Sequence, residues 1–79
     1  MLKWNSPHTV EITIDGQLYR IEGEGINDPE RGWYWWVCPQ DVHICTGSTS
    51  KLISNDQQRI AILETLYAEL RRRGIAFEE

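Results

Sequence analysis

The sequence predicts an α+β fold, in which a mainly antiparallel sheet of four or five strands carries one C-terminal amphipathic helix on one face. Three observations predict it. An alternating segment ends at Asp15-Gly16, an aromatic segment begins at Trp33, and an apolar stripe at helical spacing begins at Ile60. With 79 residues the chain has room for one core, so we expect a single domain over residues 1–79.

The first predicted element is a β-hairpin that follows an N-terminal extension, residues 1–8. From Thr9 to Ile14, apolar residues alternate with polar ones, which is typical of a half-buried strand. Asp15-Gly16 favours a tight type I′ turn, and the turn sets a register that matches apolar with apolar residues. In this register the facing residues are Ile14 and Gln17, Ile12 and Tyr19, Val10 and Ile21, and Glu11 and Arg20.

The next segments are predicted to be a loop and a second hairpin, so that two hairpins occupy residues 9–45. Glu22–Gly32 is rich in glycine and acidic residues, which favours a loop. Residues 33–38 are aromatic and favour a strand, and Pro39-Gln40 is expected to turn the chain into a partner strand, residues 41–45. The expected register places Val37 beside Val42 and Trp35 beside Ile44, with Tyr34, Trp36, His43 and Cys45 on the opposite face. Residues 46–51 are expected to form a polar loop.

The C-terminal third predicts a helix over residues 54–73 and a short terminal strand over residues 75–79. Ser54 or Asn55 can cap the helix. Its apolar stripe consists of Ile60, Ile62, Leu63, Leu66, Tyr67 and Leu70. Arg71–Arg73 suit the negative helix end, Glu69 can pair with Arg73, and Gly74 can supply the left-handed stop. Ile75 and Phe77 then alternate, as in a strand that returns to the sheet.

The charge pattern indicates which partners are compatible with the chain. Twelve acidic and eight basic side chains give a net charge of −4, which argues against nucleic-acid binding and suits a basic protein partner. The alternative is that this charge serves solubility alone. No secretory signal and no apolar segment of the ~20 residues that span a bilayer are visible, so we expect a cytoplasmic protein with reduced Cys38 and Cys45.

Few residues are candidates for catalysis or metal binding. Cys38, His43 and Cys45 are of the types that bind zinc, but their C-x4-H-x-C spacing is not a common zinc pattern. A Cys–His nucleophile would need a cleft and an orienting group, and Glu22 and Glu24 lack burial that would separate their pKa values. We therefore expect no catalytic residue, no metal and no cofactor. A small metal-binding or homodimeric domain that uses Cys38, His43 and Cys45 remains the alternative.

One face of the predicted sheet is left without a covering element. Tyr34 and Trp36 would lie on this face, and Tyr, Trp and Arg are the types that contribute most to protein interfaces. The residues predicted to bind a partner are Glu11, Arg20, Glu22, Glu24, Asp28, Tyr34, Trp36 and His43. Two alternatives remain open, namely that the rings pack on Trp4 or that they pack on a second copy of the chain.

Several segments together resemble a known family. The segments are Ile21-Glu22-Gly23-Glu24, the aromatic strand, Ile53-Ser54-Asn55-Asp56 and Arg73-Gly74-Ile75-Ala76-Phe77-Glu78. From about Thr9 to the end, the chain is similar to small bacterial immunity proteins of the immunity protein 74 type. The resemblance implies a cytoplasmic protein that binds and neutralises a cognate toxin, with the acidic charge suiting a basic, nucleic-acid-acting toxin. A phage-encoded inhibitor of a bacterial defence nuclease would share these features.

Overall fold

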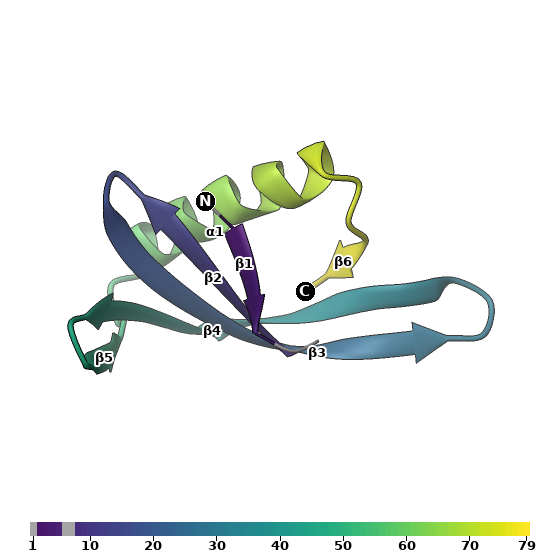
Figure 1. Cartoon of the computed structure of the whole chain (residues 1–79), viewed down its shortest axis with the longest axis horizontal. Coiled ribbons are helices and arrows are strands. Elements are labelled where there is room, and N and C mark those ends of the chain that lie inside the picture. Colours follow the sequence, from purple (N-terminus) through teal and green to yellow (C-terminus); the bar gives the residue numbers. More distant parts are fainter. Residues whose placement is uncertain (1, 6–7) are drawn as a thin grey trace.

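A computed structural model describes residues 2–5 and 8–79 of the chain. In this part of the chain, one six-stranded sheet carries a single helix (Figure 1). The elements are β1 (Leu2–Asn5), β2 (Thr9–Ile14), β3 (Gln17–Asp28), β4 (Gly32–Thr46), β5 (Thr49–Leu52), α1 (Asp56–Arg72) and β6 (Phe77–Glu78). Neighbouring strands follow the order β1-β2-β3-β4-β5 and are antiparallel, whereas β6 pairs with β4 in parallel. The predicted α+β class, with one helix and a short final strand, is confirmed.

The first hairpin forms as predicted. β2 and β3 pair in the expected register, with Val10 opposite Ile21 and Glu11 opposite Arg20. The backbone φ angles of Asp15 and Gly16 are 51° and 79°, which are the positive values that a type I′ turn requires at its two central residues. The local turn signal and the apolar alternation agree, and for this reason the sequence alone was sufficient here.

The predicted loop Glu22–Gly32 is wrong. β3 continues to Asp28, β4 starts at Gly32, and only residues 29–31 form the connecting turn. A Cβ atom added at Gly23 would lie 2.5 Å from Nε1 of Trp35, a distance that real Cβ atoms essentially never show. Glycine is therefore needed at this position because an indole ring packs against the strand, and its presence does not indicate a turn.

The predicted turn at Pro39-Gln40 is also wrong, because β4 passes through it without reversing. Ile21 of β3 pairs with Val42, and Gly23 pairs with Val37, so residues 38–41 form an irregular bulge opposite Glu22. A proline cannot donate to the ladder, and a bulge accommodates it. The long β3 strand pairs with both halves of β4. Trp35 consequently lies opposite Gly25 and Phe77 instead of beside Ile44.

Two further strands replace segments that were predicted to lack structure. β1 lies in the predicted N-terminal extension and pairs with β2, which directs Leu2 into the core. Met1, Ser6 and Pro7 of the same extension lie outside the described residues. β5 lies in the predicted polar loop, and it forms because a turn at Gly47, with a φ of 60°, brings residues 49–52 back against the end of β4.

The helix is two residues shorter than predicted at its start and one at its end. The Oδ1 atom of Asn55 accepts a hydrogen bond from the N–H of Gln58 at 2.9 Å, so Asn55 is the cap. The predicted pair of Glu69 with Arg73 forms, and Gly74 has the expected positive φ of 71°. Ile60, assigned to the buried stripe, is instead half exposed on its flank.

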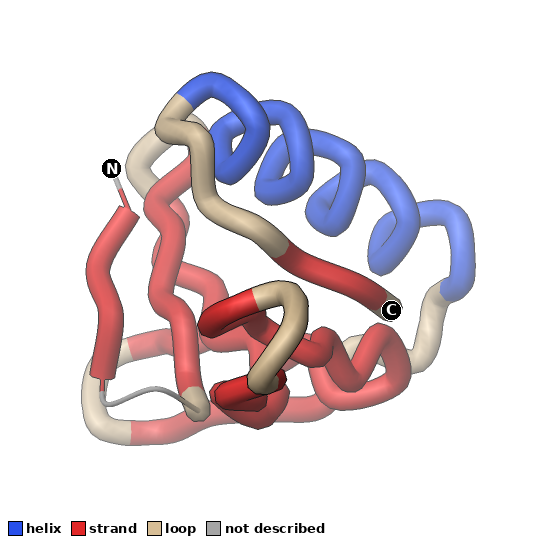
Figure 2. Tube along the Cα trace, turned by 90° about the vertical axis from the view of Figure 1, so that its right-hand side faces the viewer, coloured by secondary structure: helices blue, strands red, loops and turns tan. Residues whose placement is uncertain are grey.

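The core lies between α1 and one face of the sheet, as the end-on view shows (Figure 2). The buried helix residues are Ile62, Leu63, Leu66 and Leu70. They pack with the inward-facing residues Val10, Ile12, Ile21, Trp35, Val37 and Val42. In the part of the chain that the structure describes, no helix combines the length and the apolar character needed to cross a membrane.

Candidate partner-binding surface

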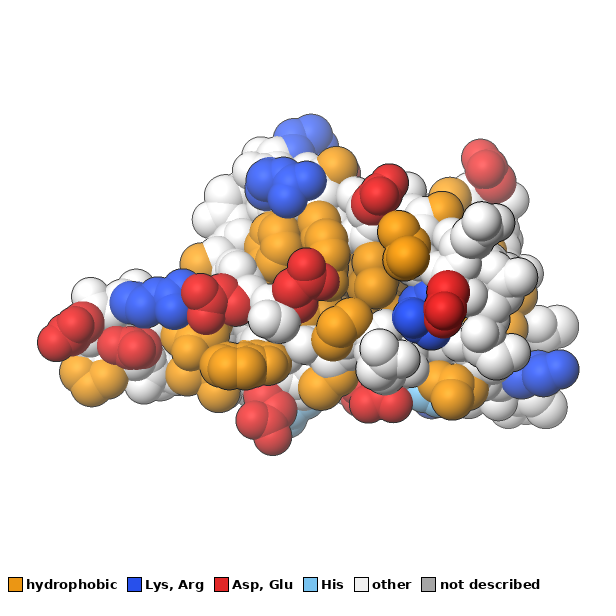
Figure 3. Space-filling model, turned by 180° about the vertical axis from the view of Figure 1, so that it is seen from behind, with side chains coloured by type: hydrophobic (Ala, Val, Ile, Leu, Met, Phe, Trp, Pro, Cys, Tyr) orange, Lys and Arg blue, Asp and Glu red, His pale blue; other side chains and the backbone are white. Residues whose placement is uncertain are grey.

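The sheet has two faces of different character. We call the face that packs on α1 the inner face and the opposite one the outer face. No helix or strand among the described residues covers the outer face (Figures 1 and 2). Seen from behind, apolar side chains gather between the helix and the sheet, whereas acidic and histidine side chains lie along the lower, outer side (Figure 3).

The strand registers place all eight predicted partner-binding residues at outer-face positions. Alternation along each strand gives the positions of Glu11, Arg20, Glu22, Glu24, Asp28, Tyr34, Trp36 and His43. Most of them fall into two groups. One group surrounds Arg20, which lies between Glu11 and His43 on the neighbouring strands, and the other surrounds Trp36, which lies opposite Glu24.

Arg20 joins three strands on the outer face. Its Nε atom is 3.3 Å from Oε1 of Glu22, and its Nη2 atom donates to Oγ of Ser50 at 3.2 Å. Glu22 also accepts a hydrogen bond from Oγ1 of Thr9 at 2.9 Å. Because the Arg20 and Glu22 side chains are 34% and 38% exposed, water screens their ion pair, and it stabilises the fold by at most about 1 kcal/mol.

Two polar atoms beneath this surface lack hydrogen bonds within the described residues. They are Nε of Arg20 and Nδ1 of His43, which lie next to each other in the register. Nε of Arg20 is close enough to Glu22 for charge attraction but is not aligned for a hydrogen bond. Unsatisfied buried polar atoms are uncommon and costly.

Trp36 is the largest exposed apolar side chain of the outer face. Its side chain is 47% exposed, and the carboxylate of Glu24 on the facing strand position is exposed as well. Glu24 forms no ion pair with any described residue. An indole next to an unpaired carboxylate can contact both apolar and cationic groups of a partner.

The prediction that Tyr34 is open to a partner is wrong, because Tyr34 is only 7% exposed. The guanidinium carbon of Arg31 lies 4.2 Å from the centre of the Tyr34 ring, and Nη1 of Arg31 is 3.0 Å from Oε2 of Glu78 in β6. The hydrogen bond with Glu78 raises the pKa of Arg31, so this cation remains charged above the ring. The C-terminal strand thus holds the side chain that covers Tyr34.

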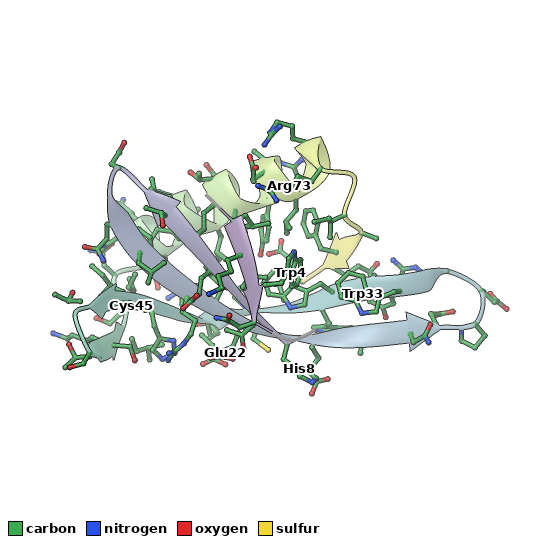
Figure 4. The ribbon with its side chains drawn as sticks, in the orientation of Figure 1. Trp4, His8, Glu22, Trp33, Cys45 and Arg73 are labelled. Atoms are coloured by element: carbon green, nitrogen blue, oxygen red, sulfur yellow. The ribbon has the colours of Figure 1, made fainter. Side chains whose placement is uncertain are left out.

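The alternative in which aromatic rings pack on Trp4 holds for two other residues. Trp33 and Trp35 both meet Trp4 edge-on, with ring centres 5.6 and 5.3 Å away. Trp4 and Trp33 lie side by side on the helix side of the sheet (Figure 4). Trp35 is fully buried, and its Nε1 donates to the backbone oxygen of His8 at 3.2 Å. Trp36 remains outside this cluster.

Asp28 is separate from both groups, because its carboxylate closes the turn between β3 and β4. Its Oδ1 atom accepts hydrogen bonds from the backbone N–H groups of Glu30 and Arg31, at 2.8 and 3.2 Å. These donors lower the pKa of Asp28 below its ordinary value. The residue therefore stabilises a turn, and its carboxylate is already engaged.

The three residues of the metal alternative do not form a ligand set. Among the described residues, no group of three or more His, Cys, Asp or Glu side chains is placed to hold a metal ion. His43 and Cys45 lie on the outer face, and Cys38 lies in the bulge of β4. Burial, together with the nearby carboxylates of Asp41, Glu24 and Glu22, raises the pKa of the Cys38 thiol, which makes it a poorer nucleophile.

The sequence-based interpretation missed three exposed or outward-facing apolar residues. Leu52 is 49% exposed opposite His43, Ile26 lies opposite Tyr34, and Trp33 is 42% exposed on the inner face. The alternation of Glu22, Glu24, Ile26 and Asp28 could have indicated a strand, but the intervening glycines favoured a loop.

Comparison of the chain with family models, curated proteins and solved structures finds no match. The resemblance to immunity proteins therefore stays a prediction.

Proposed function

We propose that this chain is a cytoplasmic immunity protein that binds a cognate bacterial toxin in a stoichiometric complex and thereby neutralises it. The proposed contact is the outer face of the sheet, and the chain itself performs no chemistry. The observation that carries the proposal is Trp36, half exposed beside the unpaired Glu24 on a sheet face with no described cover. The sequence resemblance supports the same role.

The charges favour a basic toxin. Glu22 and Glu24 lie on the same strand face, and the net charge of the chain is −4. Clustered carboxylates accelerate association with a basic surface, because charge attraction guides the diffusional encounter. Enzymes that act on nucleic acids are commonly basic around their active sites, since they bind phosphates. An acidic protein seated there would block substrate entry.

A growth assay with two tryptophan variants tests the proposal. Sequencing the genes next to the one for this chain would identify the candidate toxin domain. That domain would then be induced in bacteria that express wild-type chain, Trp36→Ala or Trp33→Ala. We expect Trp36→Ala to weaken toxin binding by about 2 kcal/mol or more, close to a thirtyfold loss of affinity, and to abolish protection at low expression. Titration calorimetry of the purified proteins measures the affinity and stoichiometry.

Trp33→Ala is the matched control. Trp33 is the same residue type, has a similar exposure of 42%, and lies on the inner face. We expect Trp33→Ala to bind the toxin as tightly as the wild-type chain does. If Trp36→Ala binds equally tightly, the outer face is not the contact. If wild-type chain neither protects cells nor forms a complex with the neighbouring toxin, the immunity role is wrong.

A further inference from the structure

In the described part of the chain, one edge of β3 has no neighbouring strand along the part of the β3–β4 hairpin that extends beyond β2. We call this part, residues 23–37, the hairpin arm. β2 pairs with β3 only as far as Glu22, opposite Thr9. Within the described residues, Glu24–Asp28 pair with β4 alone. The hairpin arm extends past the end of the helix, so α1 does not cover this edge (Figure 1).

The backbone of β3 directs hydrogen-bonding groups at this open edge. The N–H of Trp35 donates to the backbone oxygen of Ala76 at 3.0 Å, on the side of β4 that faces β6. In an antiparallel pair, two facing residues either exchange both hydrogen bonds or exchange none. Trp35 therefore exchanges none with Gly25 opposite, and the N–H and C=O of Gly25 point to the open edge. The backbone N–H and C=O of Asn27, two residues further along β3, point to the same open edge.

The edges at β1 and β5 differ from this one in length and in charge. β1 and β5 are four-residue strands that carry Lys3 and Lys51. Short strands and lysine are common protections of sheet edges. The Glu24–Asp28 edge has no lysine, and Gly25 has no side chain that would obstruct an approaching backbone.

We propose that the Glu24–Asp28 edge of β3 binds an extended segment of the partner protein as an added antiparallel or parallel strand, in which basic and apolar residues alternate. The proposal rests on the proposed function, because the toxin supplies the segment, and it identifies how the complex forms. The backbone groups of Gly25 and Asn27 provide main-chain hydrogen bonds, and the flanking side chains provide selectivity.

The side chains on the two sides of the edge define that alternation. On the inner face, Gly25 lies opposite the buried Trp35, which suits a neighbouring apolar residue. On the outer face the next position is Glu24, exposed and without an ion pair in the described residues, which suits Arg or Lys. A second copy of the chain fits less well, because it would bring acidic residues to an acidic edge.

Hydrogen exchange on the complex with the toxin domain tests the inference. We expect the amides of Gly25 and Asn27 to exchange at least about tenfold more slowly in the complex than in the free chain. We also expect Asn27→Pro, which removes one outward N–H, to bind the toxin about tenfold more weakly than Asn27→Ala. The alanine control keeps the N–H, and an unchanged exchange rate at Ile26 verifies that the β3–β4 pairing survives the proline.

The outcomes separate the docking mode from the proposed function. If the toxin binds while the amides of Gly25 and Asn27 exchange as in the free chain, the docking mode is wrong and the immunity role stands. If the toxin does not bind, a capped peptide of alternating arginine and valine decides the question: slowed exchange at these amides supports the edge site, and unchanged exchange overturns it. If the amides of Gly25 and Asn27 exchange more slowly as the concentration of the chain alone rises, a second copy binds this edge and the proposal is overturned.

Discussion

The two halves of the sheet cover their inner face with different kinds of side chain. In the half that carries α1, inward aliphatic side chains such as Val10, Ile21 and Val42 pack against Leu66 and Leu70 of the helix. In the hairpin arm, which extends past the helix, the inward aromatic side chains are Trp33 and Trp35, and both contact Trp4 of β1. A cluster of large rings thus extends the core from the helix toward the hairpin arm.

The difference explains the unusual composition of the hairpin arm. A ring that lies flat on a strand needs a position without a side chain beneath it, and Gly23 provides one for Trp35. The helix-covered half needs no such glycine, since aliphatic side chains from both layers interdigitate. Glycine and tryptophan in the hairpin arm therefore form one packing unit. Beside this unit, the edge of β3 is open within the described residues and Trp36 is half exposed.

The largest expected effect concerns two neighbouring tryptophans in the hairpin arm. Trp35→Ala removes a fully buried ring, so we expect the free energy of unfolding to fall by about 3–5 kcal/mol. Trp36→Ala removes a half-exposed ring and should lower it by less than about 1 kcal/mol. Urea denaturation of both variants measures the difference. Equal losses would mean that the ring cluster is not the core of the hairpin arm.

Gly23→Ala tests the packing unit with a smaller change. The new methyl group would meet Nε1 of Trp35 and the backbone oxygen of Trp36, each at 2.5 Å. We expect a loss of about 1–3 kcal/mol in the free energy of unfolding, because the ring and the strand must separate. Gly47→Ala is the control, since it lies at a positive φ of 60° with open space around it and costs only backbone strain. Denaturation midpoints and near-UV circular dichroism separate the two causes.

The smallest expected effect is a loss of local stability at low pH. It concerns the C-terminal end of α1 and the turn of the hairpin arm. Hydrogen bonds from Arg72 and Arg73 lower the pKa of Glu69 from 4.5 to about 2, and backbone donors lower the pKa of Asp28 from 3.8. Both folded pKa values lie below the unfolded ones. The stability that each carboxylate contributes is therefore fully present above its unfolded pKa and is lost as the pH falls through its folded pKa.

We accordingly expect the end of α1 to loosen gradually between about pH 4.5 and about pH 2, and the turn of the hairpin arm to loosen below about pH 4. Carboxyl titration by NMR locates both pKa values. In Glu69→Gln the acid dependence of amide exchange at Arg73 should disappear, whereas the turn should respond as before. A Glu69 that titrates at 4.5 would contradict the hydrogen bonds that the structure places around it.

Prediction from sequence was accurate where a local signal and a periodic pattern agreed. Asp15-Gly16 and the alternation from Thr9 to Ile14 together specify the first hairpin, and Asn55 with Gly74 delimits the helix. Prediction failed where one residue type serves two purposes. Glycine at position 23 suggested a loop, and Pro39 suggested a turn, but the structure uses them for ring packing and for a bulge.

For the candidate surface, the face on which a residue lies could be predicted in part from the sequence, but its exposure could not. Alternation assigned Glu11, Arg20, Tyr34, Trp36 and His43 to one face, and the register agrees with the assignment. The other three predicted residues, Glu22, Glu24 and Asp28, were expected in a loop and share that face only because β3 continues through them. Exposure could not be inferred in this way, because it depends on distant parts of the chain. Arg31 and Glu78, from the turn of the hairpin arm and from β6, cover Tyr34, while no described residue covers Trp36 to the same extent.

The sequence by itself thus determined the α+β class, the first hairpin, the helix to within two residues at each end, and the sheet faces on which the residues of β2 and β4 lie. These features follow from local turn chemistry and from side-chain periodicity. Only the tertiary structure decided that β3 pairs with both halves of β4, that β1 and β5 extend the sheet, and that Glu24–Asp28 pair on one side alone among the described residues. The physical reason is that strand pairing joins residues far apart in the chain. Its outcome depends on how ring volume, glycine space and competing strands fit together, and no local pattern encodes that fit.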